Sequence, residues 1–282
     1  MPTRPSFMLS LLVCLSCLTG LAGCSTVQPS ASTTLASGNE VSYFWRHGSG
    51  PVVIFQSGLG DDKNVWASVI EKLPVATQVL SYDRPGYGGS PLTSGSRDPC
   101  SIADELQQLI RRLGLNPPFI LVGHSLGGLY QYSYAQRHPE EVIGLVLIDP
   151  THPDHLVEMK RQAPAHAAIL SALRYSLFTP AMRQEFDGQS TCTAQLKAEN
   201  AVNRPLHFLF SGRFRMEEQG AFERMVRALR AQWLSMSPNA EAREVATSGH
   251  YIQKEEAGRV AEAISQLLAK SRAASAKGQG SL

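Results

Sequence analysis

A buried strand that runs directly into a G-x-S-x-G turn constrains the fold of this chain more than any other feature. The apolar residues 118–122 lead into Gly-His-Ser-Leu-Gly at 123–127. A serine between a strand and a helix must turn sharply, and the flanking glycines lack the Cβ atoms that would collide across the turn. Its hydroxyl then lies at a helix N-terminus, where backbone N–H groups favour negative charge. We therefore expect Ser125 to be a nucleophile.

A histidine after the last predicted strand is the expected general base. Residues 242–246 are typical of a short strand, the following loop contains His250, and an amphipathic helix comes next. A histidine in this loop fits the chain order serine, acid, histidine. His152 and His155 flank an aspartate, but two histidines and one aspartate in a proline-rich loop are a weak metal signal. We therefore predict no metal site.

Four carboxylates are candidates for the acid that orients this histidine. Asp149 ends an apolar, strand-like segment, and Asp154 follows five residues later. The loop after the next strand-like segment contains only Glu217 and Glu218. We favour Asp149 because the usual later aspartate is missing, and the other three carboxylates stay open as alternatives.

A Ser-Gly-Leu-Gly turn after an early strand predicts an oxyanion hole. The apolar residues 51–55 lead into this turn, whose glycines let the chain curl so that the Leu59 amide points inward. The second donor in this architecture is the amide after the nucleophile, which belongs to Leu126. Leu59 and Leu126 are therefore the predicted oxyanion donors.

These motifs resemble those of the α/β-hydrolase fold family over residues 41–270. Residues 82–90 resemble the family's D-x-x-G-x-G-x-S turn. Residues 147–154 resemble a subgroup of small esterase-like hydrolases that have an aspartate at the end of this strand, and residues 248–252 resemble the histidine loop of the same subgroup. The resemblance implies a mostly parallel, eight-stranded, doubly wound sheet and acyl-enzyme chemistry without a cofactor. Epoxide hydrolases and dehalogenases of this fold use an aspartate nucleophile, so Ser125 argues against both activities.

The sequence departs from the commoner family pattern at the predicted oxyanion loop. Gln56 and Ser57 stand where many members of the family have His-Gly. This difference implies that other hydrogen bonds support the loop.

The alternation of strand-length apolar runs with helical patterns independently predicts a parallel sheet covered on both faces. One helix is well marked, with Asp98 as its N-cap, Pro99 as its first residue and Gly114 after its end. Its apolar stripe is expected in the core, and comprises Ile102, Leu106, Leu109, Ile110 and Leu113.

The segment 151–204 interrupts this alternation, and its length predicts a partly helical cap over the site. Its apolar residues could line an acyl pocket or pack against the body: Leu156, Met159, Ile169, Leu170, Leu173, Tyr175, Leu177, Phe178 and Met182.

The N-terminus predicts export and lipid attachment. Residues 1–23 are typical of a signal peptide, and its end, Leu-Ala-Gly-Cys, resembles a bacterial lipobox that would leave Cys24 lipid-modified. We expect residues 24–40 to form a flexible tether, residues 41–270 to form the hydrolase domain, and residues 271–282 to form a disordered tail. A serine after the cysteine favours the periplasmic face of the outer membrane, by resemblance to known sorting preferences.

The number of cysteines fits an oxidising compartment, but it does not show whether a disulfide forms. Cys100 and Cys192 remain after signal removal and acylation, and they could pair in the periplasm. The sequence alone does not show whether the two residues lie close together in the fold.

The combined prediction is a lipid-anchored serine hydrolase that acts on small carboxylic esters or related acyl compounds. The formal net charge of +2 offers no electrostatic basis for nucleic-acid binding. No protein partner is evident from the sequence. The alternative is a non-catalytic ligand-binding or envelope-interaction protein on the same fold.

Overall fold

The computed structural model describes residues 30–193, 202–237 and 240–279. The predicted signal peptide, at residues 1–23, and the predicted lipidation site at Cys24 lie outside these residues. Among the described helices, none is long and apolar enough to cross a membrane.

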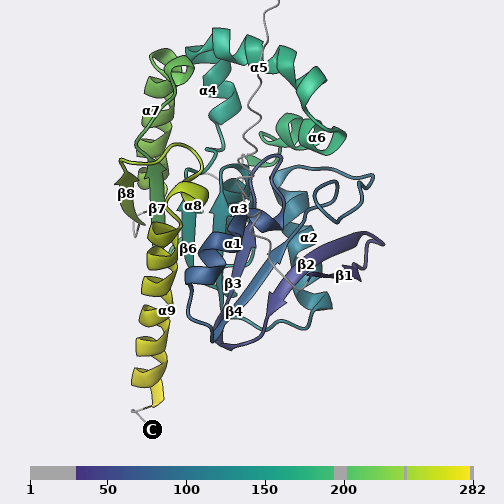
Figure 1. Cartoon of the computed structure of the whole chain (residues 1–282), viewed down its shortest axis with the longest axis vertical. Coiled ribbons are helices and arrows are strands. Elements are labelled where there is room, and N and C mark those ends of the chain that lie inside the picture. Colours follow the sequence, from purple (N-terminus) through teal and green to yellow (C-terminus); the bar gives the residue numbers. More distant parts are fainter. Residues whose placement is uncertain (1–29, 194–201, 238–239, 280–282) are drawn as a thin grey trace, which may run out of the picture.

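An eight-stranded sheet forms the centre of the molecule (Figure 1). The strand order is β1-β2-β4-β3-β5-β6-β7-β8; β1 pairs antiparallel with β2 and β2 with β4, whereas the other neighbours are parallel. The prediction of a mostly parallel sheet is confirmed. The strands are β1 (Ser30–Thr34), β2 (Glu40–Arg46), β3 (Ser49–Gln56), β4 (Thr77–Tyr82), β5 (Phe119–His124), β6 (Val142–Ile148), β7 (Leu206–Ser211) and β8 (Ala240–Val245).

Helices cover both faces of the sheet because successive strand residues point to opposite sides. In β3, Val53 and Phe55 pack on the face covered by α1 (Ala67–Lys72) and α9 (Ala257–Gln279), while Val52 and Ile54 pack on the other. That second face is covered by α2 (Pro99–Arg112), α3 (Leu126–Arg137) and α7 (Ala221–Ser235). Three short elements complete the body: η1 (Lys63–Trp66), η4 (Met216–Glu218) and α8 (Ile252–Glu255).

Helix α2 begins as predicted. The Asp98 side chain accepts hydrogen bonds from the Cys100 and Ser101 amides, at 2.9 and 3.1 Å, and Pro99 is the first helical residue. Cys100 in this first turn forms a disulfide with Cys192, across a sequence separation of 92 residues. The question that the sequence left open is therefore settled in favour of pairing.

The cap lies between β6 and β7 and consists of α4 (His155–Gln162), α5 (Pro164–Leu177) and α6 (Pro180–Gly188). Figure 1 shows these helices over one end of the sheet. Met159 packs against Met225 and Leu229 of α7, and Leu156, Leu170 and Phe178 border the same cluster. Four of the nine predicted cap residues are exposed: Ile169, Leu173, Tyr175 and Leu177.

Two boundary predictions are wrong. Within the predicted tether 24–40, Ser30–Thr34 forms strand β1 on the edge of the sheet, and the buried Leu35 joins the core beside Val41. Within the predicted tail 271–282, helix α9 continues to Gln279. Composition indicated disorder in both segments, but an available sheet edge and a run of good helix formers extended the neighbouring structure.

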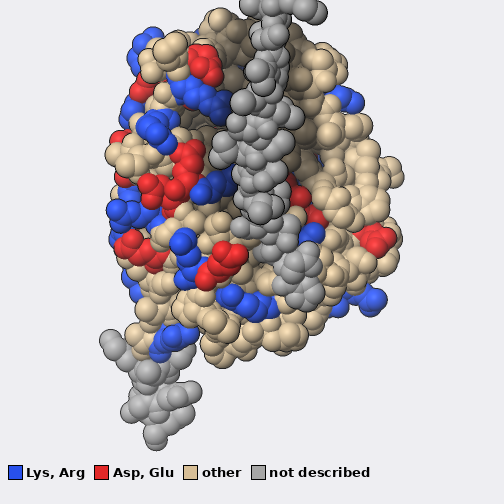
Figure 2. All heavy atoms as spheres, viewed as in Figure 1, with Lys and Arg blue, Asp and Glu red and all other residues tan. Residues whose placement is uncertain are grey.

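The surface in the view of Figure 2 carries both signs of charge, with Lys and Arg beside Asp and Glu. Exposed ion pairs also occur among the described residues, such as Arg243 with Glu262 and Lys270 with Glu241. Exposed pairs of this kind contribute little to stability.

Candidate active site

Ser125 lies at the sharp turn between β5 and α3. Its backbone angles, φ 53° and ψ −122°, belong to a region that non-glycine residues rarely adopt. A Cβ at Gly123 would lie 2.5 Å from the Gly127 carbonyl oxygen, and a Cβ at Gly127 would lie 2.3 Å from the Gln56 carbonyl oxygen. Only glycine fits at either position, which explains the G-x-S-x-G spacing in physical terms.

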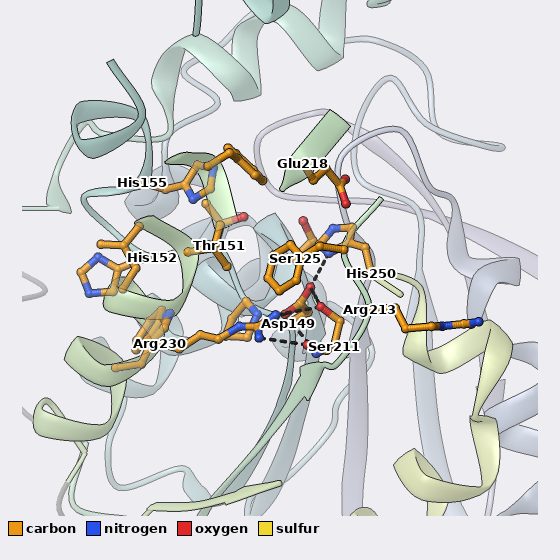
Figure 3. Close-up of a pocket in the computed structure, with 16 residues that line it drawn as sticks. Ser125, Asp149, Thr151, His152, His155, Ser211, Arg213, Glu218, Arg230 and His250 are labelled. Atoms are coloured by element: carbon orange, nitrogen blue, oxygen red, sulfur yellow. Dashed lines mark hydrogen bonds and ion pairs between the residues drawn. The ribbon is translucent and has the colours of Figure 1, made fainter. Parts of the chain in front are cut away.

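His250 and Asp149 meet beside this serine. His250 Nδ1 lies 2.7 Å from Asp149 Oδ2, and Ser125, Asp149 and His250 line one pocket (Figure 3). A carboxylate can only accept, so Nδ1 carries the proton and Nε2 of the neutral ring is left as an acceptor. This is the tautomer that a base for a serine hydroxyl requires.

The two side chains shift each other's pKa in opposite directions. Burial raises the pKa of Asp149, but the hydrogen bond and charge of His250, together with Arg230 and Ser211, outweigh it and hold this pKa well below its usual range. Burial lowers the pKa of His250, yet the hydrogen bond and charge of Asp149 raise it above 6.5 overall. Asp149 is therefore ionised at neutral pH, ready to stabilise a protonated His250.

The structure places the three alternative carboxylates away from this contact. Asp154 is the N-cap residue of α4, and its side chain is 62 % exposed. Glu217 is exposed, while Glu218 lines the pocket and accepts a hydrogen bond from the Arg215 amide at 2.9 Å. Among the described residues, none of the three hydrogen-bonds to His250.

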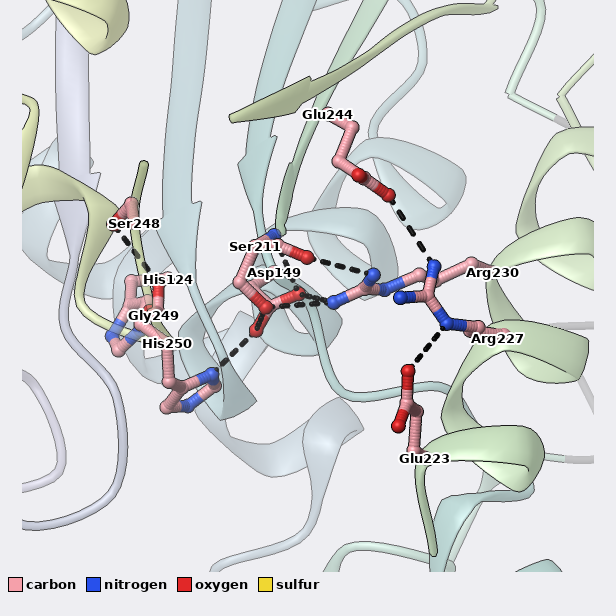
Figure 4. Close-up of polar contacts among 10 residues, drawn as sticks. All are labelled: His124, Asp149, Ser211, Glu223, Arg227, Arg230, Glu244, Ser248, Gly249 and His250. Atoms are coloured by element: carbon pink, nitrogen blue, oxygen red, sulfur yellow. Dashed lines mark hydrogen bonds and ion pairs between the residues drawn. The ribbon is translucent and has the colours of Figure 1, made fainter. Parts of the chain in front are cut away.

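Asp149 is also held by two residues that the sequence did not identify (Figure 4). Arg230 of α7 donates from Nη2 to Asp149 Oδ1 at 2.8 Å and to Ser211 Oγ at 2.7 Å. Ser211, at the end of β7, donates from Oγ to Asp149 Oδ2 at 3.0 Å. The negative charge of this carboxylate therefore interacts both with His250 and with the buried guanidinium of Arg230. An arginine in an amphipathic helix gives no sequence signal for such a contact.

His124, the variable residue of the turn, contacts both the backbone and the ring of His250. It is buried, and its Nε2 donates to the His250 carbonyl oxygen at 2.9 Å, with the two rings 4.6 Å apart between centroids. Burial holds the pKa of His124 well below its usual range, so the ring stays neutral. Its contacts therefore fix the backbone of His250.

The predicted oxyanion loop packs directly against the turn. A Cβ at Gly58 would lie 3.3 Å from Ser125 Cβ, and the Leu59 side chain packs against a cluster that contains Leu126. Among the described residues, the backbone amides of Leu59 and Leu126 have no hydrogen-bond partner. The structure thus places two free N–H groups on the two segments that lie beside Ser125.

The pocket above Ser125 has a volume of about 210 Å³. Its apolar wall comes mainly from α7 and the loop before it: Phe214, Phe222, Val226, Leu229 and Trp233. His152 and His155 also line it, and burial lowers the pKa of each to about 4. Neither belongs to a cluster of three metal-binding side chains within the described part of the chain.

Comparisons with known proteins agree with this architecture. The model of the α/β hydrolase fold matches residues 51–191. The chain is 34 % identical over 113 residues to human monoacylglycerol lipase ABHD6, and this matched region covers 39 % of this chain and 33 % of that protein. It spans less than half the length of the curated relatives it matches first.

Solved structures share the fold at low sequence identity. A thermophilic esterase from Thermogutta terrifontis has a TM-score of 0.61 and 20 % identity, with 86 % of this chain and 99 % of that chain covered. The enol-lactonase from Burkholderia xenovorans LB400 has a TM-score of 0.64 and 18 % identity, with 85 % and 100 % covered.

The close approach at Gly127 predicts that Gly127→Ala disrupts the site. A methyl group 2.3 Å from the Gln56 carbonyl oxygen must displace β3 or α3, so we expect a loss of about 1–3 kcal/mol or more in the free energy of unfolding, measured in urea. Gly258→Ala is the matched control, because a Cβ at this exposed position near the start of α9 meets no atom within 4 Å, and the free energy of unfolding should change by no more than about 0.5 kcal/mol. Equal effects of the two substitutions would contradict this account.

The contact between Arg230 and Asp149 predicts a shift in the pH profile of activity. In Arg230→Met, the positive charge that offsets the negative charge of Asp149 is lost, so Asp149 raises the pKa of His250 further. The inflection in the plot of kcat/KM against pH should therefore move to higher pH. Arg227→Met is the control, because Arg227 lies on the same helix but pairs with Glu223 and Glu244 instead. An inflection that moves to lower pH, or moves equally in the control, would contradict the assignment.

Proposed function

Because the chain belongs to the α/β hydrolase fold family, we propose that it is a serine hydrolase that cleaves carboxylic esters or related acyl compounds. The observation that carries this proposal is the 2.7 Å contact between His250 Nδ1 and Asp149 Oδ2 in the pocket that contains Ser125. A serine, a base in the correct tautomer and an ionised acid are the parts that acyl transfer requires.

In the first half of the proposed reaction, His250 Nε2 takes the proton of Ser125 as Oγ attacks the acyl carbon. The carbonyl oxygen becomes an oxyanion, which accepts hydrogen bonds from the Leu59 and Leu126 amides. As the tetrahedral intermediate collapses, His250 returns the proton to the departing alcohol. Asp149 stabilises the protonated imidazole throughout.

In the second half, water attacks the acyl-enzyme. His250 takes a proton from the water, and the same two amides stabilise the second oxyanion. The proton then returns to Ser125 Oγ as the carboxylic acid leaves. Every step uses groups of this chain and water.

The size of the pocket favours short acyl groups. Its volume of about 210 Å³ lies below the range of about 300–1,000 Å³ that is common for drug-sized ligands. Aromatic and aliphatic side chains on one wall suit a short hydrocarbon chain or a small ring.

Substitution of the three proposed catalytic residues tests this function with a short-chain p-nitrophenyl ester. We expect Ser125→Ala and His250→Ala to lower kcat by about 10⁴-fold or more, because nucleophile and base act as a unit. Asp149→Asn should also lower kcat by a large factor, because the amide no longer favours the required tautomer.

Glu217→Gln is the control for Asp149→Asn and should remain near wild-type activity. A larger loss in Glu217→Gln than in Asp149→Asn would overturn the choice of acid. Turnover that survives in Ser125→Ala would overturn the proposed nucleophile.

We further propose that this enzyme is anchored in the bacterial envelope by lipid on Cys24 and faces the periplasm, with the outer membrane favoured. The disulfide between Cys100 and Cys192 supports an oxidising compartment, where such bonds persist. Several acyl chains on one residue hold a protein firmly, since each buried CH₂ adds about 0.8 kcal/mol.

The anchor predicts that Cys24→Ser moves the full chain from the membrane fraction to the soluble fraction of a bacterial cell. The wild-type chain should also incorporate an alkyne-labelled fatty acid that the variant does not. Wild-type protein found only in the soluble fraction, without label, would contradict the anchor. Density-gradient separation of the two membranes tests the preference for the outer one.

A further inference from the structure

A buried carboxylate from the cap lies next to the predicted oxyanion loop. Glu185 of α6 is fully buried, yet it belongs to the cap rather than to the body that carries the site. Its two oxygens accept four hydrogen bonds of 2.8–2.9 Å, two from Arg84, one from Arg97 and one from Tyr87. Two positive charges outweigh burial and keep the pKa of Glu185 below its usual range.

The Arg84 guanidinium connects this carboxylate to the oxyanion loop. Its Nε and Nη2 form a two-pronged pair with Glu185, while Nη1 donates to the Ser57 carbonyl oxygen at 2.6 Å and Nη2 to the Gly58 carbonyl oxygen at 3.0 Å. Because the guanidinium is planar, fixing one edge of it on Glu185 fixes the direction of the donors on the other edge.

The Gly58 carbonyl and the Leu59 N–H belong to the same peptide unit. That unit is planar, and in the trans form its C=O and N–H point in opposite directions. An arginine that holds the Gly58 oxygen therefore also sets the direction of the Leu59 N–H. The positively charged guanidinium beside this oxygen also polarises the peptide, which strengthens the N–H as a donor.

Arg97 and a disulfide also connect α6 to the body. Arg97, just before α2, donates to Glu185 Oε1 at 2.8 Å and to Glu105 Oε2 at 2.8 Å. The disulfide between Cys192, shortly after α6, and Cys100 of α2 joins the same two parts of the chain. The position of the cap and that of the oxyanion loop are therefore coupled through one buried network.

We propose that Glu185 is a positioning residue for the oxyanion hole: it fixes Arg84, which orients the peptide between Gly58 and Leu59 so that the Leu59 N–H faces the substrate oxygen. The inference rests on the proposed function and extends it to the cap, which would control the chemical step as well as access to the pocket. It also explains how the loop is supported where Gln56 and Ser57 replace the commoner His-Gly.

The test compares Glu185→Gln with Glu105→Gln in the full chain. Both substitutions remove a carboxylate that pairs with Arg97, but only Glu185 contacts Arg84. We expect kcat for a short-chain p-nitrophenyl ester to fall by about 10–100-fold in Glu185→Gln with KM little changed, because an oxyanion donor acts on the transition state. Glu105→Gln should keep the wild-type kcat.

A second readout separates positioning from a general loss of stability. A trifluoromethyl ketone forms a tetrahedral adduct with the serine, and its inhibition constant should rise in Glu185→Gln by about the same factor by which kcat/KM falls. Arg84→Lys keeps the charge but loses the planar guanidinium, so it should weaken ketone binding and lower kcat/KM in the same way. It replaces Glu185→Gln in the test if that variant folds poorly. Thermal unfolding of every variant monitors the fold.

Two outcomes would overturn the inference. If Glu185→Gln and Arg84→Lys unfold at lower temperature but keep the wild-type kcat and ketone affinity, Glu185 serves stability alone while the proposed function stands. If the wild-type protein neither hydrolyses the ester nor binds the ketone, the proposed function fails and this inference fails with it.

Discussion

The hydrogen bond between His250 Nδ1 and Asp149 Oδ2 joins segments 101 residues apart, and the rest of the site depends on it. It sets the tautomer that leaves Nε2 free to accept a proton, and it requires a carboxylate that stays ionised while buried. His250, Arg230 and Ser211 together supply the donors that keep Asp149 ionised, and His124 holds the backbone of His250. The geometry of the proposed site is thus maintained by residues from β5, β7 and α7, and from the loops after β6 and β8.

Features with local physical causes were predictable from the sequence. The turn at Ser125 needs glycines on both sides because of close backbone contacts, and Asp98 with Pro99 specifies the start of α2. The alternation of apolar runs and helical patterns predicted the doubly wound sheet. Each of these signals lies within a few residues of the structure that it specifies.

Features that depend on distant contacts were not predictable in the same way. Arg230 and Glu185 appear in ordinary amphipathic helices, and nothing near them in the chain indicates that one reaches Asp149 and the other Arg84. The apolar wall of the pocket comes mainly from α7 rather than from the predicted apolar residues of the cap. Composition was also misleading for Ser30–Thr34, because strand pairing with β2 outweighs a polar sequence.

The central claim is that Ser125 is a nucleophile activated by His250. The most direct measurement is to incubate the purified protein with a fluorophosphonate probe and to locate the adduct by mass spectrometry of peptides. The account predicts one adduct, on Ser125, that is formed by the wild-type protein and lost in His250→Ala. A folded wild-type protein that remains unlabelled, or that is labelled at another serine, would contradict it.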